Sequence, residues 1–90
     1  MATLIDPRGN KEKVTPKDGV AFSVQELQDY VGGYIDVLSI GEGYLVFDVD
    51  GPSKDKLYNK VATELAYKYH PKEFQGFISG KAVVCRKIIP

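Results

Sequence analysis

The side chains with the greatest chemical reactivity in this sequence are one histidine, His70, and one cysteine, Cys85. In principle they could form a nucleophile and base pair, but nothing in their spacing supports one. His70 falls at the predicted end of a helix, where a cation is favourable without any catalytic purpose. Cys85 falls in a predicted strand, where burial explains a cysteine. One His and one Cys cannot build the usual kind of zinc site. We therefore predict no catalytic residue, no metal site and no cofactor.

Two glycine-containing segments match ligand-binding loops only in part. Gly41-Glu42-Gly43 precedes a predicted strand, whereas a dinucleotide-binding loop needs a further glycine and a following helix. Asp48-Val49-Asp50-Gly51 has carboxylates at calcium-loop spacing, but proline takes the next ligand position and no glutamate closes the loop. We therefore predict a hairpin turn for the first segment, and a strand end followed by a turn for the second.

Tyrosines and basic residues are the remaining candidates, because an aromatic ring can stack on a base and a cation can hold a phosphate. The chain has six tyrosines and no tryptophan. Tyr67 falls on the polar side of a predicted helix, and Tyr34 and Tyr44 flank a predicted hairpin. The basic residues that could lie near them are Lys60, Lys81 and Arg86. The alternative is that these tyrosines are half-buried at the edges of packed layers.

Length and composition indicate one globular domain over residues 1–90. Hydrophobic residues make up 43% of the chain and charged residues 27%, which is ordinary for a folded domain. There is no apolar stretch of membrane-spanning length, and the start of the sequence lacks the features of a signal peptide. A single cysteine excludes an internal disulfide and fits a reducing compartment. We therefore expect a cytoplasmic protein without a membrane partner.

The net charge is zero, but the charges are unevenly distributed. No basic residue lies between Lys17 and Lys54, whereas seven acidic residues do. From Lys54 onward, the sequence contains eight basic residues and three acidic ones. This asymmetry indicates either an anion-binding end or two halves that pair with each other in the fold. A protein that binds nucleic-acid polymers would be more basic overall, so we do not expect such a partner.

Local sequence signals predict the helices and strands that would position these side chains. Ser23 and Glu26 form a capping box at the start of a predicted helix over residues 24–31, and Gly32 can end it in the left-handed conformation. Residues 34–40 and 44–49 predict a two-stranded hairpin. A second helix over residues 58–69 is predicted to end before Pro71, with a buried stripe and a polar side. The stripe contains Tyr58, Val61, Ala62, Leu65, Ala66 and Tyr69; the polar side includes Thr63.

The remaining segments complete an α+β fold. Residues 2–5 and 11–15 predict an N-terminal hairpin, and residues 74–79 and 81–88 predict either two strands or one strand bulged at Gly80. The whole is a small antiparallel sheet packed with two helices, in the order β-β-α-β-β-α-β-β. We expect Leu45, Phe47 and Val49 to face the helices. The other face would carry Tyr44, Val46 and Asp48, joined by Leu38 and Ile40, and this apolar surplus suggests a second layer, a homo-oligomer contact or a ligand platform.

From VGGYID at residues 31–36, the chain resembles a family of small proteins of unknown function that are encoded largely by bacteriophages and other mobile elements. The likeness continues through the hairpin to Asn59 and to Ala62-Thr63-Glu64-Leu65, and then to the segment GFISGKAVV at residues 76–84. The resemblance implies a phage or mobile-element context and offers no catalytic residues.

In that context, the leading hypothesis is a non-enzymatic binder that sequesters a nucleotide-derived immune signal. Tyr34, Tyr44 and Tyr67 would stack on the ligand, and Lys60 and Arg86 would contact phosphates. Asn59 or Asp36 would donate or accept hydrogen bonds with a base or ribose. The alternative is a protein-interaction module that blocks or redirects a host protein through the apolar outer face of the hairpin. A small hydrolase dependent on His70 is a third class with less support.

Overall fold

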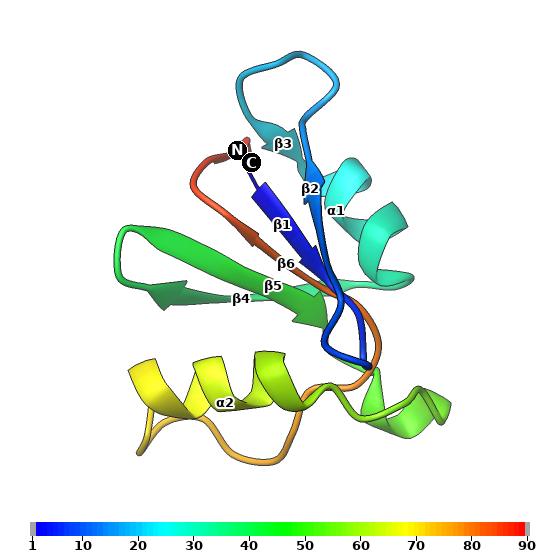
Figure 1. The fold of residues 1–90 in the computed structure, drawn as a ribbon, viewed down its shortest axis with the longest axis vertical. Helices are drawn as coiled ribbons and strands as arrows, with labels where there is room; N and C mark the ends of the chain where they lie inside the picture. Colours follow the sequence, from blue (N-terminus) through cyan, green and yellow to red (C-terminus); the bar gives the residue numbers. More distant parts are fainter. Residues whose placement is uncertain (1, 90) are drawn as a thin grey trace.

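The computed structural model describes residues 2–89, which form a five-stranded antiparallel sheet between two helices (Figure 1). The strand order is β2-β1-β6-β5-β4, so β2 and β4 are the two edges. The strands of this sheet are β1 (Ala2–Ile5), β2 (Lys11–Val14), β4 (Ile35–Ile40), β5 (Gly43–Asp48) and β6 (Ala82–Cys85). A separate parallel pair joins β3 (Phe22–Ser23) to β7 (Ile88–Ile89). The helices are α1 (Val24–Val31), the short 3₁₀ helix η1 (Pro52–Lys54) and α2 (Lys60–Tyr69).

The α1 helix forms because its two ends are capped as the sequence predicts. The Glu26 N–H donates to Ser23 Oγ at 3.1 Å, and the Ser23 N–H donates back to the Glu26 carboxylate at 3.2 Å. Gly32 ends the helix with a φ of 79°, a conformation that glycine adopts without steric cost. The predicted α+β class, the helix over residues 24–31 and the central hairpin are therefore confirmed.

The sheet has a separate hydrophobic core on each face. Leu27 and Val31 of α1 pack with Val46 of β5 and Val83 of β6 on one face. Ala62 and Ala66 of α2 pack on the other face; their partners from the strands and the loop that follows α2 are Leu45, Phe47, Ile78 and Ala82. Adjacent residues of β5 point to opposite faces, so each core receives alternate residues of the same strand. The predicted second layer is therefore a helix of this chain.

The hairpin register corrects the predicted faces of the sheet. Leu38 pairs with Leu45, and Ile40 pairs with Gly43, so Leu38 and Ile40 lie on the α2 face with Leu45 and not on the α1 face with Val46. Cross-strand partners share a face in an antiparallel pair. The prediction failed because the turn position, which sets the register, fixes the face of every residue in β4.

The C-terminal third contains the other corrections. Residues 74–79 are a loop with one isolated bridge, between Ser79 and Tyr58, and not a strand. Tyr58 and Tyr69 are exposed although the predicted stripe placed both in the core, while Thr63 is buried although it was assigned to the polar side. Tyr58 precedes the helix, which starts at Lys60. The loop that follows α2 covers the Thr63 side of the helix, which a helical pattern alone does not show.

Candidate functional site

The seven residues predicted to bind a ligand do not meet at one site. Tyr34, Asp36 and Arg86 line three different hollows of the surface. Tyr44 is paired with Ser39 and Cys85 within the sheet. Lys60 is exposed at the first position of α2. Tyr67 directs its hydroxyl to the Gly76 carbonyl at 2.8 Å, so its polar end holds a loop of this chain.

Asn59 is the clearest departure from its predicted role. It is 0% exposed and caps α2 by accepting a hydrogen bond from the Ala62 N–H at 3.0 Å. Its amide nitrogen donates to the Ile5 carbonyl at 3.1 Å and to the Gly80 carbonyl at 2.9 Å. Both amide hydrogens are thus used within the fold, so Asn59 joins three segments of the chain, and its complete burial keeps it from contact with a ligand.

A groove beside the β4 edge gathers residues from several elements of the fold. Its volume is about 510 Å³, and its walls come from β4, the end of β5, η1 and the loop after α2. The lining residues are Asp36, Leu38, Phe47, Val49, Pro52, Glu73, Phe74, Gln75, Gly76 and Phe77. We call this feature the β4 groove. Asp36 is the one predicted binding residue that lines it.

The loop wall of the β4 groove is fixed to α2 by side-chain contacts. The Ile78 N–H donates to Thr63 Oγ1 at 2.9 Å, and the Phe74 N–H donates to the His70 carbonyl at 3.0 Å. The Phe74 ring lies edge-on to Phe47 at 6.2 Å and to Tyr67 at 5.1 Å between centroids. This wall is therefore held by hydrogen bonds and aromatic packing together.

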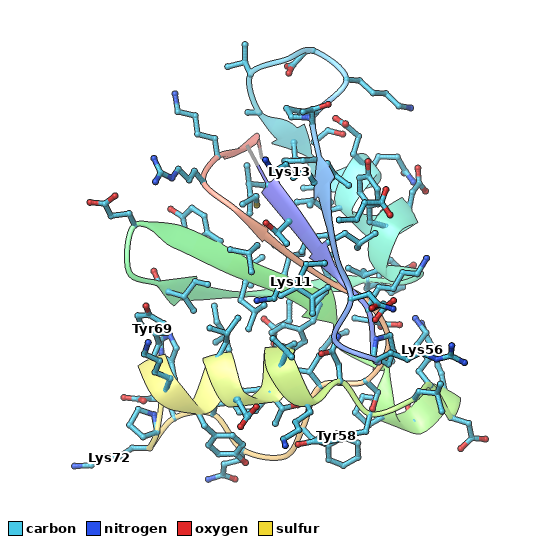
Figure 2. The ribbon with its side chains drawn as sticks, in the orientation of Figure 1. Lys11, Lys13, Lys56, Tyr58, Tyr69 and Lys72 are labelled. Atoms are coloured by element: carbon cyan, nitrogen blue, oxygen red, sulfur yellow. The ribbon has the colours of Figure 1, made fainter. Side chains whose placement is uncertain are left out.

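The lining of the β4 groove is mainly apolar, and its charged residues are acidic. Two of its apolar residues lie together at this surface and are about half exposed, Phe77 at 47% and Val49 at 49%, so the groove offers apolar area that a ligand could cover. Phe77 also packs edge-on against the exposed Tyr58, with ring centroids 5.8 Å apart, and Figure 2 shows Tyr58 on the outer surface. Asp36 and Glu73 are the charged residues of the lining. The groove therefore suits an apolar ligand group that carries a nearby positive charge.

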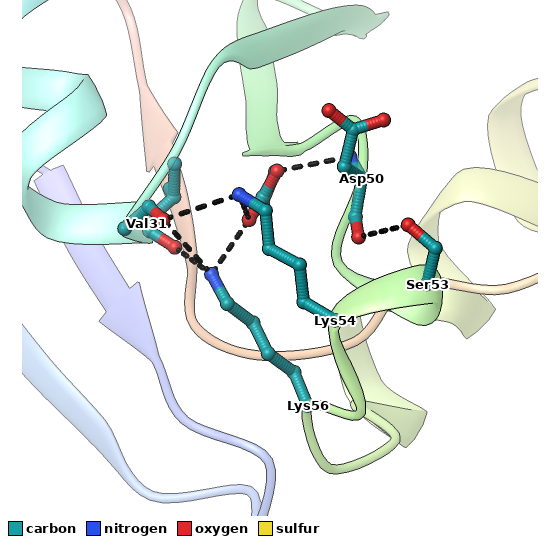
Figure 3. Close-up of polar contacts among 7 residues, drawn as sticks. Val31, Asp50, Ser53, Lys54 and Lys56 are labelled. Atoms are coloured by element: carbon teal, nitrogen blue, oxygen red, sulfur yellow. Dashed lines mark hydrogen bonds and ion pairs between the residues drawn. The ribbon is translucent and has the colours of Figure 1, made fainter.

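A partly buried ion cluster fixes the segment that follows β5 (Figure 3). The Asp48 carboxylate is 2.9 Å from Lys54 Nζ and 2.6 Å from Lys56 Nζ. Lys56 Nζ also donates to the Val31 carbonyl at 2.7 Å, and both lysines reach the Gly32 carbonyl. These carbonyls end α1, where the helix dipole favours cations. The cluster thus ties β5, the segment around η1 and the C-terminus of α1 together.

The electrostatics of this cluster favour the ionised carboxylate. Burial alone would raise the pKa of Asp48, but hydrogen bonds from Lys56, Lys54 and the Asp50 N–H outweigh burial and hold the pKa below its ordinary value of 3.8. A Cβ at Gly33 would lie 2.6 Å from an Asp48 carboxylate oxygen, so a larger residue at this position would displace the ion cluster. One carboxylate of the acidic stretch, that of Asp48, therefore pairs here with the first two lysines that follow the stretch.

Other chemistry in the described chain is limited. Burial raises the pKa of Cys85 to about 11, so this thiol is a poor nucleophile at neutral pH. Within residues 2–89, no three His, Cys, Asp or Glu side chains are grouped so that they could hold a metal ion. In the same range, no helix has both the length and the apolar character needed to cross a membrane.

Comparisons with known proteins gave no match among protein-family models, curated proteins or solved structures.

Proposed function

We propose that this chain is a non-enzymatic binding protein and that its β4 groove receives apolar side chains from a partner protein. In the mobile-element context that the sequence resemblance implies, the partner is a host protein whose action the binder blocks or redirects. The observation that carries the proposal is the exposure of Phe77 and Val49 in a groove whose charged residues are both acidic. Aromatic side chains in a preformed groove are typical anchors of protein recognition.

The groove needs little reorganisation to bind a partner. Its floor belongs to the sheet, and its loop wall is fixed to α2 by Thr63 and Tyr67. A preformed site avoids part of the conformational cost of association. The proposed binding energy therefore comes from covering side chains that are already in place.

The test is a selection of random twelve-residue peptides, displayed on phage, against the full 90-residue chain. We expect the selection to yield peptides that bind Phe77→Asp at least about tenfold more weakly than wild type, a difference of ~1.4 kcal/mol or more. The reason is that the change removes an apolar anchor and adds a third carboxylate to the groove. Affinity is measured by calorimetry. Phe77 is half exposed, so the variant should keep its fold, which circular dichroism checks.

Val20→Asp is the matched control, since Val20 is 70% exposed and lies outside the β4 groove. It adds the same charge to another apolar surface position, so it should leave peptide affinity unchanged. A selection that yields no peptide able to distinguish wild type from Phe77→Asp would contradict the proposal.

A second candidate function is the sequestration of a nucleotide-like signal at the hollow beside Tyr34. This hollow has a volume of about 440 Å³, and Lys54 lines it together with the Tyr34 ring, which is 73% exposed. It ranks second because Lys54 already pairs with Asp48, which reduces the positive charge available to a phosphate.

Calorimetric titration with cyclic and linear adenine and guanine nucleotides tests this second candidate. If one of them binds, Tyr34→Ala should weaken it by ~1–3 kcal/mol, the usual contribution of base stacking on an aromatic ring. Tyr44→Ala is the control, because Tyr44 does not line this hollow. An absence of heat with every nucleotide would exclude the candidate for these ligands.

A further inference from the structure

The outer edge of β4 presents backbone groups in a defined pattern. The Val49 N–H donates to the Tyr34 carbonyl at 3.0 Å, which makes residues 34 and 49 a hydrogen-bonded pair. Such pairs alternate along an antiparallel ladder. Residues 36, 38 and 40 therefore bond to β5, while Ile35, Val37 and Ser39 direct their N–H and C=O groups outward.

Two of these outward groups are already bonded by side chains. The Asp36 carboxylate accepts from the Val37 N–H at 2.9 Å, and His70 Nε2 lies 2.7 Å from the Ser39 carbonyl, which accepts its hydrogen. Among residues 2–89, no protein group bonds the outward N–H groups of Ile35 and Ser39 or the outward carbonyls of Ile35 and Val37. Most of the pairing capacity of this edge is thus unused.

The opposite edge of the sheet, strand β2, is protected against pairing with another chain, unlike the β4 edge. Strand β2 has the sequence KEKV, and its charged residues at 11–13 are all exposed. Charged side chains, lysine above all, discourage pairing with another chain. Strand β4 has the sequence IDVLSI, with Asp36 as its one charged residue. Of the two edges of the five-stranded sheet, the β4 edge therefore lacks the charged protection that β2 has.

We infer that an extended segment of a partner protein adds to the outer edge of β4 as a sixth strand, with apolar side chains in the β4 groove and a Lys or Arg facing Asp36 and Glu73. This inference rests on the proposed function and specifies how the partner binds. Because Asp36 and Leu38 line the groove, residues of an added strand that point to the α2 face lie over the same groove.

The charges favour a cationic partner over a second copy of this chain. Antiparallel self-pairing about Val37 would set Asp36 of each copy diagonal to the same residue of the other copy, a separation at which side chains still interact. The charged residues of the β4 groove, Asp36 and Glu73, are both acidic. Self-pairing therefore brings like charges together, whereas a Lys or Arg of the partner would neutralise them.

A cation at this position also prepares the edge for pairing. The Asp36 carboxylate holds the Val37 N–H in the unbound protein. A Lys or Arg that draws this carboxylate away releases the N–H for the incoming strand. Recognition of the charged side chain and backbone pairing are thus coupled through Asp36.

Val37→Pro tests strand addition, since proline removes an N–H that points away from β5 and keeps the internal ladder. We expect peptides selected on the groove to bind Val37→Pro about tenfold more weakly or worse, because at least one backbone hydrogen bond and the fit of the added strand are lost. Peptide binding to the wild-type chain should also slow hydrogen exchange at the Ile35 and Ser39 amides.

Lys13→Pro is the matched control on the other edge. The Asp6 N–H donates to the Asn10 carbonyl, so alternation along β1 and β2 directs the N–H of Lys13 outward as well. This variant places proline in an equivalent edge position and should leave peptide affinity unchanged. If Val37→Pro fails to fold, peptides methylated at alternate backbone nitrogens and tested on the wild-type chain provide the same comparison.

The outcomes separate this inference from the proposed function. Peptides that depend on Phe77, tolerate backbone methylation and leave Ile35 and Ser39 exchanging freely would overturn strand addition while the proposed function stands. Selected peptides without enrichment of Lys or Arg would contradict the prediction that the partner segment is cationic. A wild-type dimer in light scattering that dissociates in Val37→Pro would assign the edge to a second copy. Failure to select any groove-dependent peptide would overturn both proposals.

Discussion

Asp48→Ala is expected to lower the free energy of unfolding by about 2–3 kcal/mol, because it leaves two lysine ammonium groups at the end of α1 without their carboxylate. The side chain of Asp48 is 0% exposed, whereas those of Lys54 and Lys56 are 40% and 24% exposed. The lysines can therefore turn partly to solvent, which keeps the loss below that of a fully buried pair. Urea unfolding of both proteins at pH 7 measures the difference.

The pH dependence identifies the carboxylate as the cause. The folded-state pKa of Asp48 is lower than its ordinary value of 3.8. A depressed carboxyl pKa stabilises the folded state above the unfolded-state pKa, and this stabilisation is lost as the pH falls through the folded-state pKa. The difference between wild type and Asp48→Ala should thus be constant near neutral pH and shrink below pH 3.8.

Two comparisons separate the effect of the Asp48 carboxylate from that of other carboxylates. Backbone N–H groups also lower the pKa of Asp18 and Glu26, so acid weakens both proteins and only the difference between them reports on Asp48. Asp50→Asn removes an exposed carboxylate two residues away and should change stability by less than ~0.5 kcal/mol. A difference that persists unchanged at low pH would show that lost packing, and not lost charge, destabilises Asp48→Ala.

The elements that local chemistry determines were predictable from the sequence. The capping box of Ser23 and Glu26 and the left-handed Gly32 define α1 within its own residues. The helix before Pro71 and the hairpin around Gly41 likewise depend on neighbours a few residues away. Such signals need no knowledge of tertiary structure.

Features that depend on distant partners were not predictable in the same way. Residues 74–79 were predicted as a strand, yet they pack as a loop over α2, where Thr63 and Tyr67 supply hydrogen bonds that a sheet would otherwise supply. The face of Leu38 follows from the register of the hairpin. Both depend on contacts across the fold, which override local periodicity.

The candidate site was likewise predictable only in part, because it joins residues that are distant in the sequence. Asp36 and the apolar residues of the hairpin were visible in the sequence, but Phe74 and Phe77 join them only through the path of the loop after α2. Asp48 was assigned to a strand face, and its pairing with Lys54 and Lys56 was not foreseen. The available signal was the gap in basic residues that ends at Lys54, since the first lysines after an acidic stretch are the nearest partners for its buried carboxylate.

Asn59→Ala is expected to lower the free energy of unfolding by about 3–5 kcal/mol, because the residue is both a helix cap and a buried link between segments. Removing the side chain leaves the Ala62 N–H and the carbonyls of Ile5 and Gly80 without their bonds. The total stability of a domain of this size is only about 5–13 kcal/mol. We therefore expect a large fall in the urea midpoint, or a chain that is partly unfolded at 37 °C.

Asn59→Asp separates the two roles of this side chain. Aspartate keeps the cap, since it is as good an acceptor at a helix start as asparagine, but it replaces the amide nitrogen, which donates both bonds, with an oxygen that faces the carbonyls of Ile5 and Gly80. If the links between segments dominate, Asn59→Asp is nearly as destabilising as Asn59→Ala; if the cap dominates, it is mild. Asn10→Ala, in an exposed turn, is the control and should cost less than ~1 kcal/mol. A loss in Asn59→Ala no larger than this control would contradict the structural role, and would reopen the predicted ligand role of Asn59.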